Sequence, residues 1–293
     1  MSSYPMSDEY PPLSAKASGL ADWLAFDSRT TSEICNNAIY IYLMGVTAKM
    51  ADAIGRSDYA ETLRERYDLA KAEWNKAYVN PVNGKTKSPN GKTMHSQASY
   101  ATPLAFGVFN EEYRPKAEAY LAELTRDPRK SGLTKEEEEA EKDIPEPFNM
   151  LAFMTGPVDR SVFKPYTITT GFSGTPNILP ALSNGGYHEE AYRLISSTAF
   201  PSWLYPVTEG ATSMWERWNS YDTAFSEKTQ NNMNSFNHFA LGAVGQWMYE
   251  YQLGITSDSQ PGINGSVSAP GYQHFVLQPT AGGDFTSFSG SYE

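Results

Sequence analysis

The residues best suited to chemistry lie in a short segment rich in tryptophan, residues 209–218, with the sequence EGATSMWERW. In this segment Glu216 stands between Trp215 and Trp218. Tryptophan faces cover the apolar C–H patches of a sugar ring, and a neighbouring carboxylate accepts hydroxyl hydrogen bonds or transfers protons. The pattern is therefore typical of a sugar site. A plainer interpretation is also open, in which both tryptophans are core anchors and Glu216 is a surface charge paired with Arg217.

Two further places combine residues of the same kinds. His238 stands in the segment NSFNHFA, where we expect the last long helix to begin, although a histidine in a first turn is often only a satisfied polar group. Asp22 and Trp23 pair a carboxylate with a tryptophan in a loop ahead of the first helix. The remaining histidines are expected to be structural or surface residues: His95, His188 and His274.

Composition excludes several classes of protein. The 293 residues carry 23 Lys and Arg against 34 Asp and Glu, a net charge of −11, so nucleic acid is not an expected partner. With 40% hydrophobic and 13% aromatic residues the chain can form a large core. Cys35 is its only cysteine, and phosphate-loop, paired-histidine and hydrolase-elbow motifs are absent from the sequence. We therefore expect no disulfide within the chain, no metal and no cofactor.

Membrane association and export are not expected either. The longest nearly apolar run, residues 38–46, is shorter than the roughly 18 residues that a membrane span needs. The first twenty residues have neither a basic nor an apolar region of the kind that marks a secretory signal, and they are interpreted as a tail rich in Pro and Ser. The compartment stays open, with the cytoplasm favoured.

Apolar periodicity predicts a body of helical hairpins. A capping box at residues 30–33 predicts a helix that ends at Gly55, and a second helix with an apolar stripe is expected over residues 58–78. The short link between them predicts an antiparallel hairpin. Weaker patterns predict a second hairpin from residues 100–109 and 115–124.

The rest of the chain is expected to alternate between helices and irregular segments. The charged stretch 126–147 is interpreted as a solvated helix or mobile insertion without a function. A final long helix is expected from about Asn234 to Leu253, with Phe236 on its buried stripe and glycines 242 and 245 allowing close approach of a neighbour. We also expect helices at residues 177–183 and 189–197 and an irregular aromatic stretch at 200–221. Short strands are expected at 274–278 and 284–289.

Taken in order, several motifs carry a resemblance to a known family. They are GLADWL at 19–24, GFSGT at 171–175, FPSW at 200–203, the tryptophan-rich segment up to Trp218, and residues 234–247. In sequence and spacing they resemble the bacterial α-L-rhamnosidases of glycoside hydrolase family 78. The resemblance implies a mainly α fold, an incomplete (α/α)6 toroid of helical hairpins with a short β segment at the C-terminus. The expected division is a tail at 1–18, a catalytic-domain-like toroid at 19–255 and the start of a β-sandwich-like segment at 256–293.

The same resemblance implies a function and roles for residues. The expected activity is inverting hydrolysis of terminal α-L-rhamnosides, with a rhamnose-containing glycoside as partner and Glu216 as the general base that activates water. His238 would bind the sugar or the attacking water, and Asp22 would order its loop or touch a hydroxyl. Trp23 and Trp215 would wall the sugar pocket, and Trp218 would also belong to the substrate-binding residues.

The resemblance leaves the general acid unassigned. In the family an acidic, arginine-rich motif upstream of the Gly-Asp-Trp segment supplies it, and residues 1–18 do not match that motif. A fragment of a larger protein and a truncated paralogue are both open. Two alternative functions are also open. The first is a non-catalytic protein that either binds a sugar or completes a toroid with an oligomer or partner chain. The second is another six-hairpin glycosidase.

Overall fold

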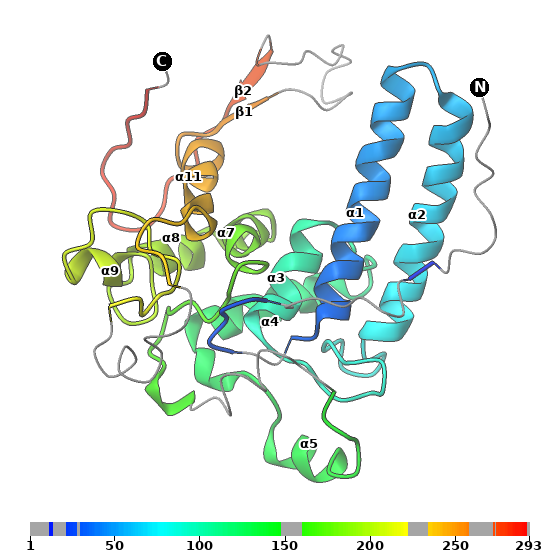
Figure 1. The fold of residues 1–293 in the computed structure, drawn as a ribbon, viewed down its shortest axis with the longest axis horizontal. Coiled ribbons are helices and arrows are strands. Elements are labelled where there is room, and N and C mark those ends of the chain that lie inside the picture. Colours follow the sequence, from blue (N-terminus) through cyan, green and yellow to red (C-terminus); the bar gives the residue numbers. More distant parts are fainter. Residues whose placement is uncertain are drawn as a thin grey trace.

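The chain is mainly helical, and its computed structural model describes seven stretches of it (Figure 1). They are residues 12–13, 22–27, 30–147, 160–221, 234–257, 272 and 274–291. The tail predicted at 1–18 lies outside the described residues apart from 12–13, and so do residues 19–21. The mainly α fold class is confirmed.

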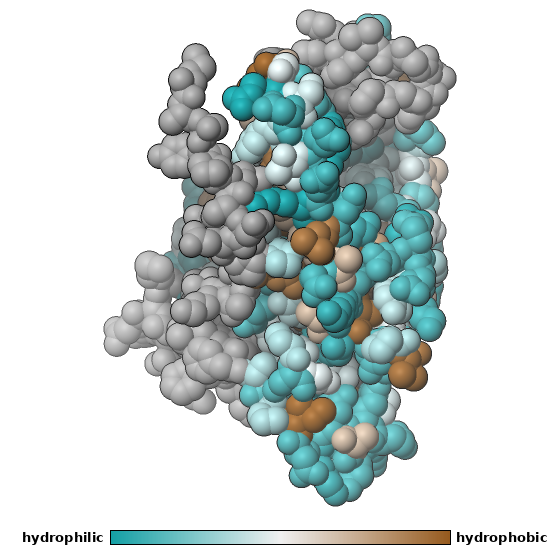
Figure 2. All heavy atoms as spheres, turned by 90° about the vertical axis from the view of Figure 1, so that its right-hand side faces the viewer, coloured by the Kyte–Doolittle hydropathy of each residue, from teal (hydrophilic) through white to brown (hydrophobic). Residues whose placement is uncertain are grey.

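The first hairpin pairs an apolar helix with an amphipathic one. α1 (Ser32–Ala53) packs against α2 (Ser57–Tyr78), and the turn between them places Gly55 at φ +75°, a conformation that favours glycine. The outward side of α2 is charged, and Figure 2 shows a mainly hydrophilic face there with scattered apolar residues. The predicted capping box is not the cap of α1, because the residue directly ahead of the helix is Thr31, which makes no side-chain cap; the Thr30 hydroxyl bonds the Ser96 hydroxyl at 2.5 Å.

Two more hairpins continue the pattern. α3 (Gln97–Ala105) pairs with α4 (Arg114–Arg126), and α7 (Thr175–Asn184) pairs with α8 (His188–Ser196), close to the predicted ranges. α1 contacts α3, and α3 contacts α7, while α2, α4 and α8 cover these helices from outside. The result is an arc of helix pairs in two layers, as expected for part of a toroid.

The loops ahead of α3 and α7 meet at one end of the arc. There the buried Gln97 amide donates to the carbonyls of Leu124 and Thr167 at 3.1 and 3.0 Å, and its oxygen accepts the N–H of Thr169 at 2.8 Å. Because buried polar groups need partners, this one side chain fixes three segments together. The candidate site is built on the loops at this end.

The predicted last helix begins later than expected. Helical structure runs through η3 (Ala240–Ala243), α11 (Val244–Trp247) and η4 (Met248–Gln252), whereas residues 234–239 form a loop. This loop bonds to residues 213–216 instead of continuing the helix, and Phe236 is 47% exposed instead of buried. The expected close approach at the helix glycines is also absent from the described residues, since a Cβ on Gly245 would meet no atom within 4 Å.

The C-terminal segment packs on the helices. β1 (Ile255–Ser257) pairs antiparallel with β2 (Phe275–Leu277), which confirms the first predicted strand, and Thr256 faces Val276. No strand forms over residues 284–289, where the rings of Phe285 and Phe288 contact Tyr192 of α8. Aromatic packing on the helical body therefore replaces the second predicted strand.

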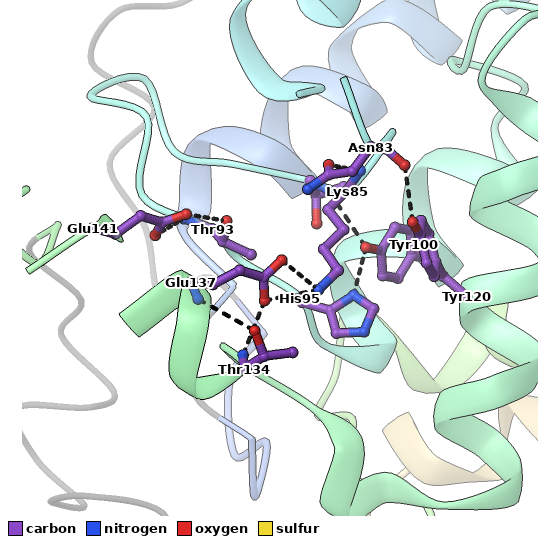
Figure 3. A network of polar contacts seen from close by, with 10 residues as sticks. Asn83, Lys85, Thr93, His95, Tyr100, Tyr120, Thr134, Glu137 and Glu141 are labelled. Atoms are coloured by element: carbon purple, nitrogen blue, oxygen red, sulfur yellow. Dashed lines mark hydrogen bonds and ion pairs between the residues drawn. The ribbon is translucent and has the colours of Figure 1, made fainter. Parts of the chain in front are cut away.

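The charged stretch holds a solvated helix that is docked by polar contacts. No residue of α5 (Lys135–Ala140) is buried, in agreement with the prediction of a solvated helix. Thr134 forms a capping box with Glu137, whose carboxylate also accepts Lys85 Nζ at 2.7 and 2.9 Å (Figure 3). Glu141 accepts the hydroxyl of Thr93 at 2.6 Å. Short 3-10 turns flank this region on both sides, η1 (Pro128–Lys130) and η2 (Arg160–Val162).

Candidate active site

Glu216 is held by pairing between two loops. Its backbone N–H donates to the Ser235 carbonyl at 2.9 Å, and its Oε2 accepts the Ser235 N–H at 2.7 Å. The residue is 8% exposed, so it is not the surface charge of the plainer interpretation. Burial lowers the pKa of the neighbouring Arg217, and the Glu216 carboxylate counteracts that effect. A fixed, nearly buried carboxylate of this kind is suited to proton transfer.

His238 extends the same loop pairing and reaches the loop ahead of α7. Its N–H donates to the Met214 carbonyl at 2.9 Å, and its ring stacks on Phe172 with centroids 5.0 Å apart. Nδ1 accepts the Ala240 N–H at 3.2 Å. An accepting Nδ1 carries no proton, so the neutral ring has its proton on Nε2, where it is a donor suited to a sugar hydroxyl or a water.

Asp22 fixes the loop that carries Phe172. Its Oδ1 accepts the N–H groups of Ser173 and Gly174 at 2.9 and 2.8 Å, and its Oδ2 accepts that of Gly171 at 2.8 Å. Burial raises the pKa of this carboxyl to about 6, although the three hydrogen bonds lower it. The charge of Asp27 adds to the rise. These contacts fit the first of the two predicted roles, ordering the loop.

The turn that carries Asp22 lies against the 171–174 loop without a gap. Phe172 N–H donates to the Trp23 carbonyl at 2.9 Å. A Cβ on Gly171 would lie 2.0 Å from that carbonyl oxygen and 2.6 Å from the Ala25 nitrogen. Only glycine permits this approach, since real Cβ contacts below 3.0 Å essentially do not occur.

An aromatic cavity of about 460 Å³ opens beside Glu216, within the size range of small-molecule sites. Its walls include Trp215, Tyr221 and Phe236, with Glu209 at its edge. The Trp215 ring meets the Phe236 ring edge to face at 5.8 Å and lies 6.5 Å from Tyr221. Glu216 itself does not line the cavity. The aromatic walls are suited to the apolar face of a sugar or an aromatic group.

The other two predicted tryptophans lie in different settings. Trp218 is 2% exposed, donates its indole N–H to the Thr170 carbonyl at 3.1 Å and packs edge to face on Trp203. Trp218 thus supports the segment ahead of the 171–174 loop from behind. Trp23 is partly exposed in the Asp22 turn. The binding roles of Trp23, Trp215 and Trp218 stay predictions.

Sequence reasoning missed several residues of this site. Phe172 joins His238 to the Asp22 loop, Ser235 pairs with Glu216, and Tyr221 and Phe236 line the cavity. The motif GFSGT contains a signal for Phe172, because a bulky side chain between two nearby glycines, Gly171 and Gly174, marks a loop with close approach. The partner of Ser235 depends on a contact across 19 positions that no local pattern encodes.

Neither a metal centre nor a membrane span is found in the part of the chain that the structure describes. No cluster of three or more His, Cys, Asp or Glu side chains there is arranged to hold a metal ion. None of the helices described is both long and apolar enough to cross a membrane.

Comparison with known proteins decides the family. The model of the “bacterial alpha-L-rhamnosidase 6 hairpin glycosidase domain” matches residues 6–132 and 158–252, more than half of the chain. The chain belongs to the bacterial α-L-rhamnosidase six-hairpin glycosidase family. This rhamnosidase family member is 30% identical to an α-L-rhamnosidase of Streptomyces avermitilis over 271 residues, which cover 92% of the chain and 21% of that relative. An α-L-rhamnosidase of Formosa agariphila is 30% identical over 77% of the chain and 20% of its own length.

Solved structures agree with the family. The crystal structure of the Streptomyces avermitilis α-L-rhamnosidase complexed with L-rhamnose matches with a TM-score of 0.67 and 28% identity, over 93% of this chain and 21% of that one. An Aspergillus terreus α-L-rhamnosidase matches with a TM-score of 0.69 at 23% identity and so supports the fold alone. The rhamnosidase family member therefore spans about a fifth of the length of the bacterial relatives and 26% of the Aspergillus terreus protein.

Proposed function

We propose that the chain supplies the base side of an inverting α-L-rhamnosidase active site, with Glu216 as the general base. One observation carries the proposal. Glu216 of the tryptophan-rich motif is held almost buried by Ser235, in the same loop pair that carries His238, next to an aromatic cavity. Membership in the rhamnosidase family supports the choice of sugar.

The reaction follows from the carboxylate. As the water oxygen forms a bond to the anomeric carbon, its proton passes to Glu216, and the bond from that carbon to the glycosidic oxygen breaks. Inversion requires a second carboxyl about 6.5–9.5 Å from the base to protonate the leaving oxygen. No residue of this sequence is assigned to that role, so a leaving group that departs without a proton is the suitable substrate for a test.

The experiment uses an α-L-rhamnoside of 2,4-dinitrophenol, whose phenolate leaves unprotonated. Chain 1–293 is expected to release the phenolate faster than buffer does, and Glu216→Gln is expected to lower the rate by about 10²–10⁴-fold, the usual contribution of a general base. Glu61→Gln is the matched control, because Glu61 is an exposed acid of α2 that does not line the cavity. Equal rates for the wild type and Glu216→Gln would refute the assignment.

A second candidate function is a protein that completes a toroid with a second copy of itself. α1 carries an exposed apolar stripe with helical spacing: Tyr40, Leu43 and Met50. A helix that is apolar on all sides is normally covered on all sides. Sedimentation equilibrium is expected to detect a dimer that Leu43→Lys abolishes and that Leu69→Lys, at an equally exposed leucine of α2, leaves intact. A monomer at all concentrations would contradict this candidate.

A third candidate, another six-hairpin glycosidase, differs in its sugar. It predicts that an aryl glucoside or glucuronide is cleaved faster than the rhamnoside, and the order of rates decides between them. The cytoplasmic location favoured by the sequence stays a prediction.

A further inference from the structure

A second cavity, of about 410 Å³, lies apart from the aromatic one, between the loop ahead of α3, the C-terminal end of α4 and the start of α5. Its volume lies within the range of about 300–1,000 Å³ that small-molecule sites occupy. The loops around it belong to the same end of the helix pairs as the candidate active site. His95 lies directly ahead of the α3 cap, and its carbonyl accepts the N–H of Gly132 at 2.7 Å.

The lining of this cavity is rich in basic side chains, in a chain whose net charge is −11. Four basic side chains line it, against the single carboxylate of Glu123: Lys85, Arg129, Lys130 and Arg160. Two carboxylates outside the lining, Asp127 and Glu137, also bond to these bases. The pairs formed by Arg129 and Lys130 are half-exposed, and pairs of that kind contribute little. An incoming anion can therefore share their hydrogen bonds at small cost.

The lining also offers hydroxyl groups and an aromatic face. Ser131 is 2% exposed, and its Oγ has no hydrogen-bond partner among the residues that the structure describes. The Ser131 hydroxyl is therefore enclosed, whereas Thr134 is exposed and lines the cavity. Thr134 and the ring of Tyr120 line the same space. Hydroxyl donors and an aromatic ring beside cations are suited to a sugar that carries an anionic group.

The walls of this cavity are fixed in place. The Lys85 and Glu137 side chains, 12% and 22% exposed, form a two-point ion pair that joins the loop after α2 to α5 (Figure 3). His95 Nδ1 lies 2.6 Å from the Tyr100 hydroxyl, and Tyr120 donates to the Asn83 carbonyl at 2.8 Å. Fixed walls favour binding because little side-chain freedom remains to be lost.

We propose that this cavity is a subsite for a sugar that carries a carboxylate, a uronate residue of the glycan from which rhamnose is removed. The inference deepens the proposed function and rests on it for the saccharide character of the ligand. Arg129, Lys130 and Arg160 receive the carboxylate, and Thr134 meets a hydroxyl group. The ligand binds without any covalent step. Binding of the uronate in this cavity gives the candidate active site a preference for rhamnose attached to acidic polymers.

The test measures binding of D-glucuronate to chain 1–293 by ligand-observed NMR titration, with D-glucose as the neutral probe and inorganic phosphate as the anion without a sugar. Glucuronate is expected to bind about tenfold more tightly than either probe, since a charge-assisted hydrogen bond is worth about one decade of affinity. Binding to glucuronate is also expected to weaken as salt is added. The variant Glu216→Gln should retain this binding, which separates failure of the subsite from failure of the proposed hydrolysis.

Matched variants identify the cavity. Arg129→Gln and Arg160→Gln are each expected to weaken glucuronate binding about tenfold. Arg56→Gln is the control, because it removes an equal charge from an exposed ion pair at the start of α2, and it should change glucuronate binding less than twofold. Absence of saturable binding, equal binding of phosphate and glucuronate, or equal losses in Arg56→Gln and Arg160→Gln would overturn the proposal.

Discussion

Gly171→Ala is predicted to separate the Asp22 turn from the loop that carries Phe172. The new Cβ would lie 2.0 Å from the Trp23 carbonyl oxygen, and ordinary contact begins at 3.4 Å, so the turn must move by about 1.4 Å. The hydrogen bond from Phe172 to Trp23 is 2.9 Å long, and the three hydrogen bonds to Asp22 are 2.8–2.9 Å long. A shift of this size takes all four beyond hydrogen-bonding distance.

Four lost hydrogen bonds at about 0.5–1.5 kcal/mol each give a loss of about 2–6 kcal/mol in the free energy of unfolding. That loss is a large part of the total stability of an ordinary domain. The assay is urea unfolding followed by tryptophan fluorescence. Gly245→Ala is the matched control, because a Cβ there meets nothing within 4 Å and alanine favours a helix by about 0.5–1 kcal/mol. If the two variants unfold at the same urea concentration, the close approach at Gly171 is refuted.

Two other predictions concern charge. Burial raises the pKa of Asp22 from 3.8 to about 6. Between pH 3.8 and pH 6 the folded chain therefore keeps a proton that the unfolded chain releases. The free energy of unfolding of the wild type falls by about 3 kcal/mol as the pH rises through this range. Asp22→Asn lacks this fall, so the stability of the variant relative to wild type should rise by that amount between about pH 3.5 and pH 7; a constant difference would contradict the raised pKa. Lys85→Met is expected to speed hydrogen exchange in α5 because it breaks the partly buried pair with Glu137, whereas Lys76→Met, at an exposed pair, should leave that exchange unchanged. Equal exchange in both variants would mean that the ion pair does not hold α5.

The sequence allowed the helix pairs to be predicted because their signals are local. The apolar positions of α1 and α2 repeat every three to four residues, and Gly55 marks the turn between them. The α3 and α7 pairs follow from similar patterns, helped by Pro115 near the start of α4. Family motifs then directed attention to Glu216 and His238.

The remaining features depend on contacts between distant segments. The start of the last helix was placed too early because residues 234–239 satisfy their backbone groups on the 213–216 loop, which periodicity does not reveal. The first helix begins one residue later than the capping box at Thr30 predicts, and the Thr30 hydroxyl bonds Ser96, 66 positions away. The docking of α5 was missed because a charged helix with no buried residue shows no apolar pattern, although ion pairs and a cap fix it.

In the proposed reaction, Glu216 activates a water on the face of the sugar opposite the leaving group. The most direct measurement is the anomeric configuration of the rhamnose first released by chain 1–293 from the dinitrophenyl α-L-rhamnoside, followed by ¹H NMR before mutarotation. We expect β-L-rhamnose, because the attack of one water inverts the configuration. Release of α-L-rhamnose first would mean that a covalent intermediate forms, and it would contradict the role of Glu216 as a general base.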